Sequence, residues 1–187
     1  HGGVVLPDGS IQEVAIDFDT LRNLSEISRK EYGLAGAVQH GASTLPDTAF
    51  SRFPDAGTAE IHLATNFQNM VFDHPALPDD LRRRMYDWCR ENLPEERKPG
   101  DTEEQFIYKA RKKALGAFKR ELWELPEEIW SQIGGALREQ FAFLFRQLAV
   151  VNTREVVQRH VTAPERPRSG PVALRIKAAA DDWDLSD

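Results

Sequence analysis

Two histidines that each precede a glycine are the residues best suited to chemistry. They are His1, followed by Gly2, and His40, followed by Gly41. A histidine at the end of a strand can bind a metal, and a glycine after it lets the backbone come close to a phosphate. Zinc at a catalytic site keeps three protein ligands and one open position, and these histidines would supply two of the three. The pattern predicts a metal-dependent enzyme for a phosphorylated substrate; the alternative for each histidine alone is a surface or capping role.

Phosphate-binding donors follow two short apolar runs. The runs cover residues 34–39 and 59–64, and we expect each to be a buried parallel strand. Ser43 and Thr65 offer hydroxyl groups after these strands, and Gly41 offers a backbone N–H. Groups of this kind bind phosphate when they gather at one edge of a sheet.

The elements that must position these residues follow a βα order. The pattern predicts a helix over residues 19–32, the first strand, a short helix over residues 44–53 and the second strand. Two such strands fit either a small open α/β domain or one part of a barrel. Phosphate sites commonly follow strands 7 and 8 of a (β/α)8 barrel. We therefore expect an α/β fold, namely the C-terminal part of a (β/α)8 TIM barrel (about strands 6–8) with a helical C-terminal extension.

The sequence after residue 78 has almost entirely helical patterns. Helices are predicted over residues 78–92 and from the Thr102–Gln105 capping box to about residue 122. A long helix begins at Pro126 and a short one near Asn152. The expected organisation is a barrel part carrying the zinc and phosphate loops (residues 1–77), a helical extension (78–161) and a tail (162–187).

Charge and cysteine content limit the class of partner. The formal net charge is −6, which argues against nucleic acid as a partner. The basic run at residues 109–113 is flanked by acids, and we interpret it as a solvated helix face. Cys89 is the single cysteine, which suits a reducing cytosol, and no apolar run is long enough to span a membrane. We expect a cytoplasmic protein with no membrane partner.

From His1 to about Pro78 the sequence resembles the C-terminal part of the class II, zinc-dependent fructose-bisphosphate aldolases. The resemblance lies in three stretches in the family's order and spacing: HGGVV at residues 1–5, GAVQHGAST at 36–44 and GTAEIHLATN at 57–66. It implies an aldehyde-lyase of glycolysis and gluconeogenesis. The reaction would be reversible cleavage of fructose-1,6-bisphosphate to dihydroxyacetone phosphate and glyceraldehyde 3-phosphate, with zinc stabilising the enediolate.

The resemblance also implies roles for particular residues. His1 and His40 would bind zinc, and a monovalent cation is a further candidate cofactor. In the family a basic residue from the helical extension of a neighbouring subunit can bind the second phosphate, and Arg111 is the candidate here. Contacts to phosphate and triose are implied for Gly2, Gly41, Ser43, His62, Ala64 and Thr65.

Two of these positions depart from the family pattern. His62 stands where many members have an asparagine that touches the triose, and Ala64 stands where many have an aspartate. The departures leave open a tagatose-bisphosphate or other ketose-bisphosphate aldolase, and a non-catalytic phosphosugar-binding scaffold. A third alternative is a helical interaction module in residues 78–161.

The family's third zinc histidine, catalytic aspartate and acidic proton-shuttle residue have no counterpart in these 187 residues. In the family they belong to the N-terminal part of the protein. We expect this chain to be inactive alone and the catalytic residues to come from that N-terminal part. The expected partners are therefore the sugar bisphosphate, the N-terminal part of the same protein and further copies in a homo-oligomer.

Overall fold

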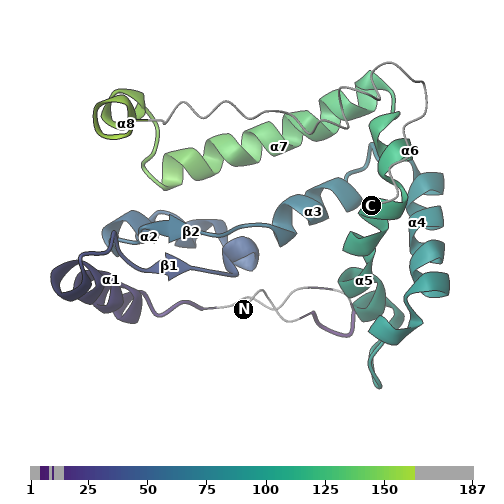
Figure 1. Ribbon diagram of the computed structural model, residues 1–187. Coiled ribbons are helices and arrows are strands. Elements are labelled where there is room, and N and C mark those ends of the chain that lie inside the picture. The colour runs from purple at the N-terminus through teal and green to yellow at the C-terminus, as the bar shows by residue number, and fades with distance from the viewer. Residues whose placement is uncertain (1–4, 9, 11–14, 163–187) are drawn as a thin grey trace, which may run out of the picture. The chain divides into compact units, whose positions relative to one another are not determined.

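The computed structural model describes residues 5–8, 10 and 15–162 (Figure 1). Its contacts divide the chain into two units between Val151 and Asn152. Short 3-10 helices occur at η1 (Ala42–Thr44), η2 (Asp47–Ala49) and η3 (Pro94–Glu96). The strands and α-helices are α1 (Phe18–Tyr32), β1 (Val38–Gln39), α2 (Arg52–Asp55), β2 (Glu60–Ile61), α3 (Thr65–Phe72), α4 (Asp79–Asn92), α5 (Glu103–Ala117), α6 (Lys119–Trp123), α7 (Glu127–Gln147) and α8 (Arg154–His160).

The predicted barrel portion is wrong. Within the described part of the chain, helices dominate and the sheet consists of two short parallel strands. β1 pairs with β2 in parallel, with Val38 opposite Glu60 and Gln39 opposite Ile61. The strand that would carry His1 falls outside the described residues.

The backbone on both sides of β1 explains why the strands are short. Gly36 has a φ of 140° and Gly41 a φ of 70°, conformations that side chains rarely adopt and that turn the chain out of an extended path. A Cβ at Gly36 would also lie 2.8 Å from the Gly57 carbonyl oxygen. The apolar run at 34–39 therefore contributes only two residues to the ladder, and an apolar run alone does not fix strand length.

One core packs around the strands and joins them to α1, α2 and α7. Asp17 caps α1 through hydrogen bonds from the N–H groups of Asp19 and Thr20, and Gly33 ends it in the left-handed conformation. The helix predicted for residues 19–32 is therefore confirmed, and it begins one residue earlier, at Phe18, after the Asp17 cap. The buried residues of this core are Phe18, Leu21, Ala42, Leu45, Phe50, Phe53, Ala56 and Leu144.

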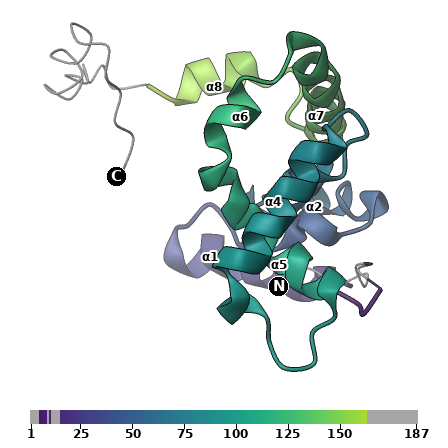
Figure 2. The same ribbon diagram turned by 90° about the vertical axis from the view of Figure 1, so that its right-hand side faces the viewer.

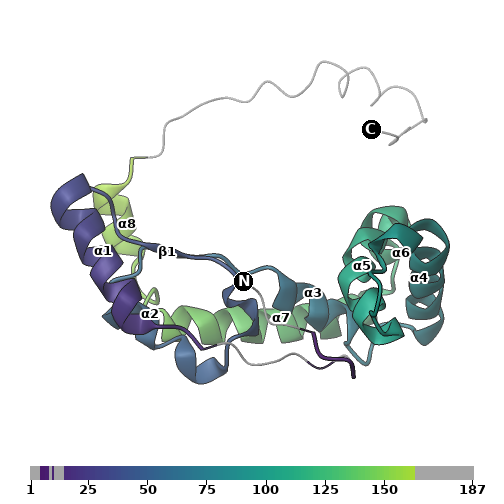
Figure 3. The same ribbon diagram turned by 90° about the horizontal axis from the view of Figure 1, so that it is seen from below.

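A second core forms where α3, α4, α5 and α6 meet. Figures 1 and 3 show α4, α5 and α6 gathered as one group, and α4 and α5 make extensive contacts. The capping box is present, since Thr102 accepts from the Gln105 N–H and Gln105 from the Thr102 N–H. The helix predicted to reach residue 122 instead breaks after Ala117 into α5 and α6. The buried residues are Phe72, Leu77, Leu81, Met85, Cys89, Phe106, Ile107, Ala110, Ala114, Phe118 and Leu122.

The second unit contributes α8 (Figure 2). The side chains of this helix are all exposed. Arg159 and His160 lie in its last turn, where positive charge is favourable at the negative end of the helix dipole. Among the described helices of both units, none has the length and apolarity needed to cross a membrane.

The thiol of Cys89 is expected to be unreactive while the chain is folded. The side chain is fully buried in the second core, and burial raises the pKa of the Cys89 thiol. The thiolate is the reactive species, so both effects slow its modification. Labelling with a disulfide reagent should require added urea, and rapid labelling of the native protein would contradict the buried placement.

Candidate functional site

The ends of the two strands bring two histidines together. His40 follows β1 and His62 follows β2, and because the strands are parallel both residues lie at the same edge of the sheet. Their ring centroids are 4.3 Å apart, with the ring planes at 63°. Both side chains are exposed. The residues that the sequence assigns to metal and to triose are therefore neighbours.

Ser43 links the loop after β1 to the start of α3. Gly41, in the left-handed conformation, turns the chain from β1 directly into η1. The Ser43 Oγ accepts a hydrogen bond of 2.8 Å from the Ala64 N–H. A hydroxyl that accepts a bond still has its own proton to donate. Ser43 can therefore hold the loop in place and donate to an anion, whereas the Ala64 N–H is already used.

The loops that follow β1 and β2 line an open pocket of about 450 Å³, which we name the strand-end pocket. Five of its seven lining residues are those assigned to phosphate or triose from the sequence. α3 begins at Thr65, and the first N–H groups of a helix lack partners within it and attract anions. The lining residues are Gly41, Ser43, Ile61, His62, Leu63, Ala64 and Thr65.

Glu60 contacts His62 and is not among the site residues predicted from the sequence. Its Oε1 lies 2.5 Å from Nε2 of His62. Residues two apart in extended backbone share a face, so the spacing of Glu60 and His62 within the predicted strand at 59–64 is the signal that could have found it. A neutral His62 donates through Nε2 to the carboxylate and keeps Nδ1 as an acceptor. Glu60 thus fixes the orientation of the ring that lines the strand-end pocket.

The donors at this edge are compatible with zinc. His40 offers an exposed imidazole beside a second imidazole, and nitrogen donors of this kind suit zinc. Across the part of the chain that the structure describes, no three histidine, cysteine or acidic side chains form a complete ligand set. His1, the other predicted ligand, and Gly2 lie outside the described residues. His40 fits as one ligand of a site completed by other residues.

Arg111 lies on α5, away from the strand-end pocket, and is held by its own chain. Its guanidinium donates to both carboxylate oxygens of Asp73, at 2.5 and 3.0 Å, and to Oδ1 of Asn69 at 2.7 Å. It also lies over the rings of Phe72 and Tyr108. Burial opposes its charge, but the bonds to Asp73 and Tyr86 outweigh burial and raise the pKa of Arg111. Within this chain the guanidinium ties α5 to the end of α3.

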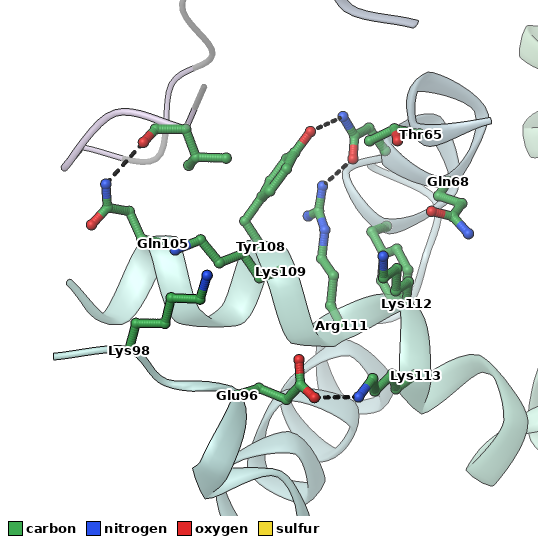
Figure 4. Close-up of a pocket in the computed structure, with 13 residues that line it drawn as sticks. Thr65, Gln68, Glu96, Lys98, Gln105, Tyr108, Lys109, Arg111, Lys112 and Lys113 are labelled. Carbon is green, nitrogen blue, oxygen red and sulfur yellow. Dashed lines mark hydrogen bonds and ion pairs between the residues drawn. The ribbon is translucent and has the colours of Figure 1, made fainter. Parts of the chain in front are cut away.

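The basic run at 109–113 does more than face solvent, which corrects its interpretation as a solvated helix face. It lines a second cavity of about 650 Å³ beside α5 (Figure 4). Thr65 borders both cavities. We name this cavity the α5 pocket; its charged lining residues are Glu96, Lys98, Lys109, Arg111, Lys112 and Lys113.

Comparisons of the chain with models of protein families, with curated proteins and with solved structures find no match. Only the sequence motifs and the geometry of the two pockets therefore indicate a function.

Proposed function

We propose that this chain is part of a class II aldolase that reversibly cleaves fructose-1,6-bisphosphate to dihydroxyacetone phosphate and glyceraldehyde 3-phosphate. The observation that carries the proposal is the strand-end pocket, which Ser43, His62 and Thr65 line, with the ring of His40 beside that of His62. The proposal depends on this local arrangement of two parallel strand ends.

In this proposal the phosphate of the three-carbon unit binds at the strand-end pocket. The Ser43 hydroxyl donates to a phosphate oxygen while it accepts from the Ala64 N–H, so the donor is fixed before substrate arrives. Gly41 has no side chain to block the approach of the anion. α3 begins at Thr65, and the N-terminus of a helix favours a bound anion. Fixing the phosphate orients the reacting carbons.

His40 and His62 act at the reacting end of the substrate. His40 would hold zinc, which supplies a Lewis acid that polarises the substrate carbonyl. His62, oriented by Glu60, offers its remaining ring nitrogen to a hydroxyl or carbonyl of the triose. His62 fills more space than the asparagine found in many family members, which favours a related ketose bisphosphate as the second candidate substrate.

The remaining parts of the active enzyme come from outside this chain. We assign the third zinc ligand and the residues that transfer protons to the N-terminal part of the same protein. Trp123 and Phe145 expose large apolar surfaces, which favours contacts with further copies of the chain.

The test is cleavage of fructose-1,6-bisphosphate by the full-length protein, before and after treatment with a chelator. Activity that is lost with the chelator and restored by zinc would support the proposal. Cleavage of tagatose-1,6-bisphosphate instead would identify the second candidate. Bound zinc without cleavage of either sugar would contradict an aldolase and favour a phosphosugar-binding scaffold.

Replacing Ser43 with alanine is expected to reduce kcat/KM for the bisphosphate by roughly 10- to 100-fold, because one hydrogen bond to a charged group is lost. The same change removes the acceptor for the Ala64 N–H. Ser51→Ala is the matched control, since Ser51 is exposed and does not line the strand-end pocket. Equal kinetics for wild type and Ser43→Ala would remove Ser43 from the phosphate site.

A further inference from the structure

The α5 pocket concentrates positive charge in an acidic chain. Five cationic side chains and one acidic side chain line it, whereas the whole chain carries a net charge of −6. Four of the five cations come from a single helix segment, Lys109 to Lys113. Like charges three or four residues apart destabilise a helix unless other charges compensate them. The question is which anions compensate these charges.

Acidic side chains of the chain compensate three of the five cations. Lys109 lies 2.6 Å from Asp101, Arg111 is bonded to Asp73, and Lys113 is paired with Glu96. Within the described residues, Lys98 and Lys112 form no direct ion pair. Both lie near Glu96, whose pKa is lowered mainly by the bond from Lys113 and to a smaller extent by their charges. Figure 4 shows Lys98 and Lys109 directed toward one another below Gln105. Asp101 already serves Lys109: the hydrogen bond from Lys109 lowers the pKa of Asp101, and the charge of Lys98 lowers it further. Lys98 and Lys112 are therefore the cations without a direct carboxylate partner that a bound anion could contact.

The rest of the lining adds hydrogen-bond donors and an apolar wall. The Tyr108 hydroxyl accepts a bond of 3.0 Å from the Asn69 amide, which leaves its own proton to donate. Gln68 also lines the cavity, and Phe72 contributes an apolar wall. The volume of about 650 Å³ lies within the ~300–1,000 Å³ typical of small-molecule sites.

We propose that the α5 pocket binds a phosphorylated small molecule that carries at least two negative charges, at a site separate from the strand-end pocket. Lys98 and Lys112 contact the anionic groups, with the Tyr108 hydroxyl as a further donor. Arg111 is not a ligand in this proposal: its bonds to Asp73 and Asn69 hold the wall of the pocket in place. The site goes beyond the proposed aldol cleavage and does not depend on it.

The test is calorimetric titration of the full-length protein with inorganic pyrophosphate, at low and at physiological ionic strength. We expect saturable binding that weakens as salt increases. The double variant Lys98→Gln/Lys112→Gln should bind at least about tenfold more weakly, because two charge-assisted contacts are lost. The matched control is Lys30→Gln/Lys119→Gln, which removes the same charge outside the pocket and should change the affinity less than about twofold.

The proposal would be overturned by no saturable binding of the wild type, by equal weakening in both double variants, or by no weakening in either. Ser43→Ala separates the two pockets, since Ser43 lines only the strand-end pocket of the two. If Ser43→Ala weakens pyrophosphate binding as much as the Lys98/Lys112 pair does, the anion binds at the strand ends and the proposal is wrong. Circular dichroism of each variant and zinc content after each titration exclude unfolding and metal removal as causes. Failure of aldol cleavage leaves this result unaffected.

Discussion

Replacing His40 with alanine is expected to abolish zinc binding at the strand ends and to lower kcat/KM for the bisphosphate at least about a thousandfold, or about 4 kcal/mol of transition-state stabilisation. The imidazole of His40 is exposed at the edge of the sheet, so its removal opens no cavity in the core. The loss should therefore appear in metal content and turnover, and not in the urea midpoint. Metal analysis of the purified variant and single-turnover cleavage are the measurements.

The control for His40 is His160→Ala, which removes an exposed histidine from α8. This variant should keep the zinc content and turnover of the wild type. His62→Ala separates metal binding from substrate contact, since it should retain zinc and weaken substrate binding. Full zinc occupancy and turnover in His40→Ala would remove His40 from the metal site and leave the proposed function without its metal ligand.

Helix boundaries could be predicted from the sequence because their causes are local. The Thr102–Gln105 capping box is made by residues three apart, and Gly33 ends α1 by its own backbone conformation. α3 was not predicted. It begins at Thr65, and Ala64 before it offers no side chain to cap the helix, so the sequence carries no capping signal for its start.

Strand length could not be predicted in the same way because a strand depends on its neighbours. The apolar runs at 34–39 and 59–64 show that parallel strands are favoured, and β1 and β2 lie within them. How far the ladder extends is decided by the glycine turn at Gly41 and by the start of α3. The barrel was an extrapolation from two runs to a whole sheet.

The same distinction between local and long-range causes holds for the candidate site. His40, Ser43 and Thr65 could be placed together because the ends of adjacent parallel strands meet at one edge. The partners of Arg111 could not be predicted, since Asp73 is far from it in the sequence and reaches it only through the packing of α3 against α5. The α5 pocket needs the same tertiary information, because its lysines come from both sides of the Thr102 cap.

The bonds of Arg111 to Asp73 and Asn69 should make it important for stability. Arg111→Met keeps an apolar stem over the rings of Phe72 and Tyr108 and removes the charge. We expect the free energy of unfolding to fall by about 2–3 kcal/mol, the range for hydrogen bonds to charged groups. The expected loss is smaller than that for a fully buried ion pair, because the Asp73 side chain is 59% exposed and is rehydrated when its partner is removed. Urea unfolding followed by circular dichroism and by exposure of the Cys89 thiol measures the change.

Arg120→Met is the matched control, since Arg120 forms an exposed pair with Glu124 at 2.8 Å and is 89% exposed. Removal of such a pair should change stability by less than about 0.5 kcal/mol. The loss of stability in Arg111→Lys should lie between those of Arg111→Met and Arg120→Met. An ammonium keeps the charge but cannot bond both oxygens of Asp73 at once. If Arg111→Met unfolds at the wild-type midpoint yet loses affinity for the bisphosphate, the guanidinium binds the second phosphate and does not brace α3 against α5. If Arg111→Met unfolds at a lower urea concentration than the wild type while its folded fraction retains full affinity for the bisphosphate, the guanidinium serves to hold Asp73 and Asn69.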